Sequence, residues 1–247
     1  MLYSYSSSHA NPCKSLTNER NPMNTLTTSP CSVVVARLLA EADASDARLD
    51  EQRRTPPPSE AATQLTSTED PQALYRSLKD FHLAVSRETA TLLYLLARST
   101  RARTLVEFGT SFGVSTLHLA AALRDNGGGR LIGTEFEPTK VAQARANIAA
   151  AGLDDLVEIR TGDAVETLAQ DLPEVIDLVL LDGAKGLYPT VLSLLEPRLR
   201  PGALVVADNA DWSPEYLARV RDPAAGYVSV PFASDVELSM KLARDHR

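Results

Sequence analysis

The sequence predicts an α/β protein with a mostly parallel sheet that ends in an antiparallel hairpin. From Thr104 onward, short apolar runs alternate with amphipathic stretches, a pattern typical of βαβ units. Near the C-terminus, only three residues separate the apolar runs 227–232 and 236–242. That connection is too short for a parallel crossover, so these two strands should pair as a hairpin at one edge of the sheet.

Five further runs give a sheet of seven strands. They span residues 104–108, 130–135, 156–160, 175–182 and 203–208. Helices are expected between them, on both faces of the sheet, at about 114–124, 138–151, 163–171, 187–199 and 213–221. In the second of these helices, Val141, Ala144, Ile148 and Ala151 recur at the spacing of one helix face.

The part before the sheet divides into two regions. Residues 1–31 are rich in Ser, Thr and Asn and hold three Asn-Pro or Ser-Pro steps, which predicts a disordered extension. Residues 32–100 should form N-terminal helices, one near 32–49 and one near 70–99, joined by a proline-rich linker. Within the second helix, Ser86 is a candidate N-cap. Residues 101–247 should then form the core domain.

Composition narrows the class of protein. The chain has 247 residues and a net charge of −7, which disfavours nucleic acid and anionic membranes as partners. No apolar run reaches the 18 or more residues of a membrane span. Both cysteines, Cys13 and Cys31, lie in the N-terminal extension, so a disulfide framework is not expected. We therefore expect a cytoplasmic protein.

A tight loop, residues 109–113, joins the first strand to a helix. Its glycines let the backbone turn closely beneath a ligand, which makes it a candidate nucleotide-binding loop. The dinucleotide fingerprint G-x-G-x-x-G would need two more glycines where the chain has Ser111 and Val114, so NAD is the weaker hypothesis. The alternative is a turn that serves only packing.

Two more strand ends carry carboxylates. Glu135 ends the second strand, where a carboxylate can accept both hydroxyls of an adenosine ribose. Asp163 follows the third strand and could bind an adenine amino group, while Ala164 leaves room for the ring; alternatively, Asp163 caps the next helix. Together with the glycine loop, these features indicate S-adenosylmethionine as the ligand.

A second polar group ends the fourth and fifth strands. If those strands are neighbours, Asp182, Asp208 and Asn209 form an all-oxygen cluster of the kind that holds Mg²⁺. Lys185 would point at the same opening and could take a hydroxyl proton. Each of the two segments, taken alone, is more often explained without a metal. Its aspartate then closes a turn or caps a helix, and Lys185 is a solvated lysine.

Four segments in this order resemble the motifs of class I S-adenosylmethionine-dependent O-methyltransferases of the caffeoyl-CoA and catechol O-methyltransferase group. They are LVEFGTSFGVS at 105–115, Glu135, LDGAK at 181–185 and ADN at 207–209, and the resemblance covers roughly residues 70–247. It implies a Rossmann-like methyltransferase fold and a homodimer. It also implies cofactor contacts from Val85, Ser86, Glu107, Gly109, Thr110, Ser111, Gly113, Ser115, Glu135, Asp163, Ala164 and Asp182, metal ligands Asp182, Asp208 and Asn209, and catalytic roles for Lys185 and Asp182.

The chain departs from the family pattern in places. Gly183 and Ala184 stand where many members have bulky residues, and Trp212 is either a pocket wall or a residue packed at a helix entry. Asp235 or Glu237 could supply a carboxylate to a second acceptor hydroxyl. The leading hypothesis is methyl transfer to a hydroxyl of a small, catechol-like acceptor with divalent-metal assistance. The alternatives are a tRNA hydroxy-base methyltransferase and a non-catalytic S-adenosylmethionine-binding protein.

Overall fold

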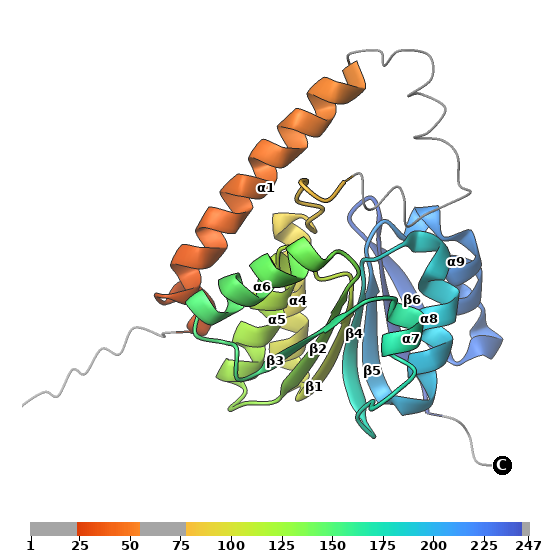
Figure 1. Cartoon of the computed structure of the whole chain (residues 1–247). Helices are drawn as coiled ribbons and strands as arrows, with labels where there is room; N and C mark the ends of the chain where they lie inside the picture. The colour runs from red at the N-terminus through yellow and green to blue at the C-terminus, as the bar shows by residue number, and fades with distance from the viewer. Residues whose placement is uncertain (1–23, 55–77, 244–247) are drawn as a thin grey trace, which may run out of the picture.

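A seven-stranded sheet forms the centre of the molecule (Figure 1). The structure is a computed structural model that describes residues 24–54 and 78–243. The strand order is β3-β2-β1-β4-β5-β7-β6. The strands are β1 Thr104–Phe108, β2 Arg130–Glu135, β3 Val157–Thr161, β4 Ile176–Leu181, β5 Leu199–Ala207, β6 Tyr227–Phe232 and β7 Val236–Lys241.

The sheet has the topology that the sequence predicts. Strands β1 to β5 pair in parallel, and β7 runs antiparallel to both β5 and β6, so the hairpin forms one edge. Strand β5 starts at Leu199, four residues before the expected start. An irregularity in the register with β4 lets Leu199 pair with Ile176 ahead of the regular ladder, which begins at Leu204.

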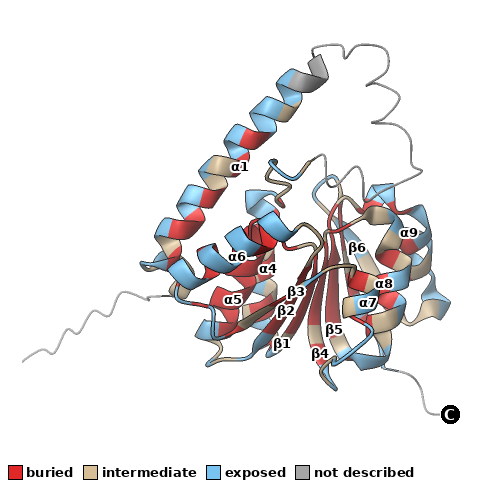
Figure 2. Ribbon diagram, in the orientation of Figure 1, coloured by how far each residue is buried: buried red, intermediate tan, exposed pale blue. Residues whose placement is uncertain are grey.

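Helices cover both faces of the sheet (Figures 1 and 2). One face carries α4, α5 and α6, with α1 packed outside them, and the other carries α7, α8 and α9. Short 3₁₀ turns lie between these elements. The helices are α1 Cys31–Arg54, α4 Arg87–Ser99, α5 Val114–Asp125, α6 Pro138–Ala150, α7 Ala164–Thr167, α8 Tyr188–Leu195 and α9 Pro214–Arg221.

Four helices differ from the prediction. Helix α8 ends at Leu195, before the expected end near residue 199, because a 3₁₀ turn leads from it into β5. Helix α1 continues to Arg54, past the expected end near residue 49. The helix expected over 70–99 begins only at Arg87, because Ser86 is its N-cap, with Oγ accepting the Thr89 N–H at 3.0 Å; residues 55–77 lie outside the described part of the chain. Helix α7 is a single turn where a helix over 163–171 was expected.

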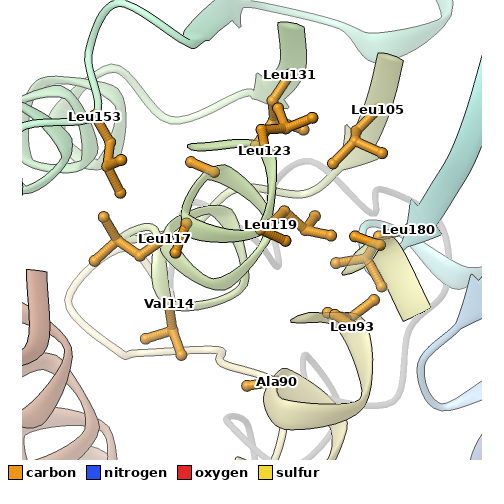
Figure 3. Close-up of a cluster of buried hydrophobic side chains, with 14 of the residues drawn as sticks. Ala90, Leu93, Leu105, Val114, Leu117, Leu119, Leu123, Leu131, Leu153 and Leu180 are labelled. Carbon is orange, nitrogen blue, oxygen red and sulfur yellow. The ribbon is translucent and has the colours of Figure 1, made fainter. Parts of the chain in front are cut away.

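The larger core surrounds helix α5, which packs against both the sheet and α4 (Figure 3). Ten of its twelve residues are buried, so it is enclosed on nearly every side rather than along one stripe. The close-up shows Leu119 and Leu123 of this helix on the side of the leucines from the strands and from α4, while Leu117 points toward Leu153, which follows α6. This packing holds the start of α5, and with it the loop after β1, in a fixed position.

The N-terminal segment joins this core. Residues 1–23 lie outside the described part of the chain, but residues 24–31, which we expected to be disordered, form a 3₁₀ turn at Thr25–Thr27 and the start of α1. The Asp125 carboxylate accepts hydrogen bonds from the backbone N–H of Thr25 at 3.0 Å and from the Tyr94 hydroxyl at 2.7 Å. Cys31 is buried, and burial raises the pKa of its thiol to about 11. Helices α1 and α4 thus share one core with the sheet.

Across residues 24–54 and 78–243, we find no helix with both the length and the apolar composition of a membrane span.

Candidate active site

The predicted site residues meet at the carboxyl ends of the parallel strands. The Asp182 N–H donates to the Phe108 carbonyl at 2.8 Å, which places the end of β4 beside the loop after β1. The Asp208 N–H donates to the Leu181 carbonyl at 2.9 Å and joins the end of β5 to the end of β4 in the same way. This edge is where open α/β sheets bind their ligands.

Two adjoining cavities open at this edge. The larger is a cleft with about 820 Å³ of empty space, and Gly109, Ser111, Glu135, Asp163, Ala164 and Asp182 are among its lining residues. The smaller, of about 230 Å³, is lined by Thr110, Ser115 and residues 82–84, and it shares Leu83, Gly109, Ser111 and Asp182 with the cleft. Together they suit an elongated ligand.

Four of the predicted cofactor residues lie behind the lining instead. Val85 is buried in the core, Ser86 caps α4, and Gly113 precedes the first residue of α5. Glu107 is fully buried under the loop. The segment that reaches the smaller cavity is residues 82–84, directly before the predicted Val85 and Ser86.

Glu107 organises the loop from below. Its carboxylate accepts hydrogen bonds from the hydroxyls of Ser115 at 2.6 Å, Thr116 at 2.6 Å and Thr110 at 3.0 Å. Burial outweighs these bonds and raises the pKa of Glu107 from 4.5 to about 7. The carboxyl group therefore gains a proton more readily in the folded chain than in the unfolded one.

This pKa predicts a pH dependence of stability. Between pH 4.5 and about 7, folded Glu107 binds a proton that the unfolded chain has released, so the free energy of unfolding falls as pH rises through this window. The increase in the pKa of Glu107 from 4.5 to about 7 is equivalent to about 3 kcal/mol in the free energy of unfolding over the whole window. Urea unfolding at pH 5 and pH 7.5 should show most of this loss in the ligand-free wild type, whereas Glu107→Gln should lose about 2 kcal/mol less over the same interval. Equal slopes in the two proteins would contradict the assignment.

Glu135 and Asp163 line the cleft as predicted, and each also holds local backbone. Glu135 Oε2 accepts the Ser111 N–H and Oε1 accepts the Glu137 N–H, both at 2.8 Å. Asp163 is the N-cap of α7 and accepts the Val165 N–H at 2.7 Å. The two interpretations of Asp163, ligand contact and helix cap, are therefore compatible.

From the ribose contact that the sequence predicts for Glu135, we expect Glu135→Gln to weaken S-adenosylmethionine binding by about 1.5–3 kcal/mol, because a charged hydrogen-bond acceptor becomes a neutral amide. Isothermal titration calorimetry would measure the change. Thermal unfolding of the ligand-free variant is the control, because Glu135 also holds Ser111. Unchanged affinity in a folded variant would remove Glu135 from the ribose site.

Three charged groups meet beside the cleft. Lys185 Nζ lies 2.8 Å from Asp182 Oδ1, and the carboxyl groups of Asp182 and Asp208 lie close enough to repel each other. Burial raises the pKa of Asp182 against the pull of Lys185. Burial, followed by repulsion from Asp182, raises the pKa of Asp208 to about 7. Two buried carboxyl groups facing each other need a proton or a cation between them.

Asn209 and Asp235 add two further polar side chains beside Asp208. Asn209 Nδ2 donates to Asp235 Oδ2 at 3.1 Å, which orients the amide of Asn209. Glu237 lies within β7 and pairs instead with Arg221 at the end of α9, at 2.6 Å. Asp235, not Glu237, is thus the hairpin carboxylate at the site.

The predicted metal ligands fit a divalent cation by their chemistry. Asp182, Asp208 and Asn209 offer two carboxylates and one amide, and hard cations prefer oxygen ligands. Within the described ranges, no three His, Cys, Asp or Glu side chains are arranged to hold a metal, so the amide of Asn209 would be a required member.

Gly183 and Trp212, two positions at which the chain departs from the family pattern, have different surroundings in the structure. A Cβ on Gly183 would lie 2.4 Å from the Phe108 ring, so this ring occupies the space that a bulky residue would need. Trp212 is 69% exposed and lines neither cavity.

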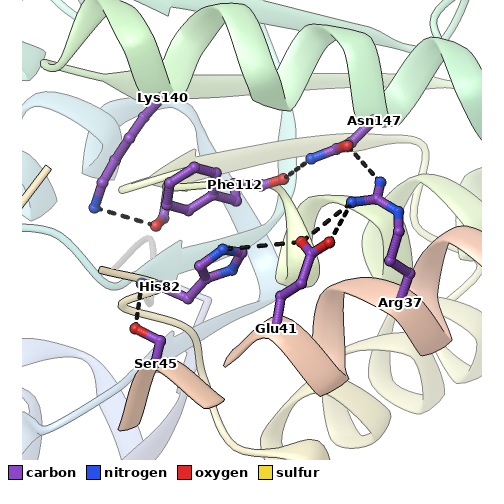
Figure 4. Close-up of polar contacts among 8 residues, drawn as sticks. Arg37, Glu41, Ser45, His82, Phe112, Lys140 and Asn147 are labelled. Atoms are coloured by element: carbon purple, nitrogen blue, oxygen red, sulfur yellow. Dashed lines mark hydrogen bonds and ion pairs between the residues drawn. The ribbon is translucent and has the colours of Figure 1, made fainter. Parts of the chain in front are cut away.

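The sequence reasoning missed Lys140, Phe112 and His82, which lie together beside the loop (Figure 4). The His82 and Phe112 rings stack with centroids 4.0 Å apart, and Lys140 Nζ lies 5.3 Å from the Phe112 centroid. Helix α1 holds His82 in place, because Ser45 Oγ accepts its backbone N–H at 2.9 Å. The sequence offered one sign that Lys140 lies close to the core. This residue directly precedes Val141, which belongs to the apolar stripe of the same helix.

Comparison with known proteins gives consistent matches. A family model described as "Methyltransferase domain" matches residues 106–210. The chain is 39% identical over 130 residues to a catechol O-methyltransferase of Niastella koreensis, covering 51% of this chain and 58% of that protein. It is 32% identical over 165 residues to the catechol O-methyltransferase of Mycobacterium tuberculosis, covering 64% and 74%.

Two solved structures share the fold. Cofactor-bound Rv0187 from MTB superposes with a TM-score of 0.59 at 26% identity and covers 77% of this chain and 99% of its own. The O-methyltransferase TomG from Streptomyces achromogenes, solved in complex with SAM, has a TM-score of 0.57 at 27% identity and covers 78% and 99%.

Proposed function

Because this chain belongs to the S-adenosylmethionine-dependent O-methyltransferases, we propose that it methylates one hydroxyl of a small acceptor with two adjacent hydroxyls. The observation that carries this proposal is the group Asp182, Asp208 and Lys185 at the edge of the cleft. It brings a proton acceptor and a set of oxygen ligands to one place. The matched catechol O-methyltransferases support the same acceptor class.

The chemistry is a displacement at the methyl carbon. The acceptor oxygen forms the new bond to that carbon while the bond from carbon to sulfur breaks, which releases S-adenosylhomocysteine. Lys185 takes the hydroxyl proton after its ammonium has released one to solvent, and Asp182, 2.8 Å away, stabilises the ammonium that forms again. The rigid strand ends hold the oxygen in line with the methyl group, which lowers the entropic part of the barrier.

Asp182, Asp208 and Asn209 would hold a magnesium ion beside Lys185. Such an ion makes a bound hydroxyl more acidic and fixes its position. The raised pKa of Asp208 supports this assignment, because a cation would remove the repulsion between the two carboxyl groups. Asp235, hydrogen-bonded to Asn209, lies where it can accept the second hydroxyl of the acceptor. A homodimer and a cytoplasmic location remain predictions from the sequence.

The experiment is an assay of S-adenosylhomocysteine release with catechol, phenol and 2-methoxyphenol as acceptors. We expect turnover of catechol but not of phenol or 2-methoxyphenol. A chelator should abolish the turnover of catechol, and added Mg²⁺ should restore it. Asp208→Asn should reproduce the chelated state and still bind S-adenosylmethionine. Full turnover by metal-free protein would contradict metal assistance. Turnover of tRNA but not catechol would favour the nucleic-acid alternative, and cofactor binding without any turnover would favour a binding protein.

A further inference from the structure

Lys140 places a buried positive charge at the cleft. It is the third residue of α6, is only 4% exposed and lines the larger cavity. Its ammonium has one long hydrogen bond, 3.4 Å to Ser111 Oγ, and lies 5.3 Å from the centre of the Phe112 ring (Figure 4). Burying an ammonium is costly unless its three donors find partners.

Protein carboxylates do not fill this role in the part of the chain that the structure describes. None of the ion pairs within residues 24–54 and 78–243 includes Lys140. Glu135, Glu137 and Asp182 act on it only at longer range, and burial still lowers the pKa of Lys140. The contacts of this ammonium leave donors available to a ligand in the cleft.

The position of Lys140 indicates which part of a ligand it meets. Ser111, its hydrogen-bond partner, lines both cavities, and Phe112 lines the smaller one. The ammonium therefore stands where the cleft with Glu135 and Asp163 meets the cavity with Ser115. His82 stacks on Phe112, and Ser45 of α1 holds the backbone of His82. These contacts fix the wall formed by His82, Phe112 and Lys140, which carries the positive charge.

We propose that Lys140 binds the carboxylate of the methionine end of S-adenosylmethionine. This proposal rests on the proposed function and adds a residue to its cofactor site. At neutral pH the adenosine part of the cofactor is uncharged, and the carboxylate is its only anion. A ligand that places adenosine near Glu135 and Asp163 extends its methionine end past Ser111, within the reach of a flexible lysine. A buried pair of opposite charges then replaces a buried lone charge.

The test compares S-adenosylmethionine with its decarboxylated analogue, since both carry the sulfonium and differ in the carboxylate. Calorimetry should show that Lys140→Met weakens S-adenosylmethionine by about tenfold to a hundredfold and the analogue by less than about twofold. Lys140→Arg should recover part of the lost affinity. Lys79→Met, which removes an exposed lysine, is the control for net charge and should match the wild type.

Other outcomes would overturn the assignment. If Lys140→Met weakens both ligands equally, Lys140 contacts the adenosine part; if it weakens neither, the ammonium serves another group. Thermal unfolding of each variant would show whether it folds, and Lys140→Arg provides a second variant should Lys140→Met fail. Failure of the proposed function would be seen in a different protein, the wild type. The wild type would then not bind S-adenosylmethionine, or would bind it without turnover.

Discussion

Lys185→Met is expected to lower kcat for methyl transfer by about 10²- to 10⁴-fold, with the affinity for S-adenosylmethionine changed by less than about threefold. In the proposed mechanism Lys185, which lies 2.8 Å from Asp182 beside the cleft, is the proton acceptor. Methionine keeps the length of the side chain and removes its basic nitrogen. Steady-state kinetics with saturating acceptor would measure kcat, and calorimetry would measure cofactor binding.

Lys185→Arg separates the role of the proton acceptor from that of the charge. Arginine keeps the positive charge beside Asp182 but does not lose its proton, so it should be nearly as inactive as Lys185→Met. In both variants the rate should rise with pH until the acceptor hydroxyl itself ionises. An active Lys185→Arg enzyme with an unaltered pH profile would show that Lys185 acts only as a charge.

Gly109→Ala should destabilise the protein by about 2–5 kcal/mol and abolish cofactor binding in the protein that still folds. Gly109 has a φ of +98°, and a Cβ there would lie 2.6 Å from the Asp182 carbonyl oxygen. The substitution therefore adds backbone strain and pushes the end of β4 away from the loop after β1. Urea unfolding and calorimetry would measure the two effects.

Gly128→Ala is the matched control. Its φ is +105°, and no heavy atom lies within 4 Å of the added Cβ, so only the backbone strain remains. We expect a cost of about 1–2 kcal/mol and unchanged cofactor binding. Equal losses of stability for the two variants would show that the close approach of Gly109 to Asp182 has no energetic consequence.

The strands and most of the residues that line the two cavities were predictable because their patterns are local. Apolar runs such as 104–108 and 130–135 are long enough to define buried strands, and the parallel order brings their carboxyl ends to one edge. Glu135 and Asp182 therefore needed no knowledge of side-chain packing. Strand β5 began earlier than expected because its first residue pairs across an irregularity, which no local pattern reveals.

The final hairpin shows where local patterns stop. Asp235 and Glu237 are two residues apart, so the alternation of side chains along a strand assigns both to one face and cannot choose between them. Pairing with β5 places Ala207 opposite Glu237 and leaves Asp235 just before β7, next to Asn209. The choice between them depends on contacts with β5, about thirty residues earlier in the chain.

Periodicity and the order of motifs were enough to predict the α/β class, the hairpin at the edge and the strand ends that carry carboxylates. Contacts between distant segments decided the rest. The wall formed by His82, Phe112 and Lys140 exists because α1, α5 and α6 pack around the loop after β1. The burial of Lys140, and with it the charge offered to a ligand, arises from this packing because burial depends on neighbours from the whole chain.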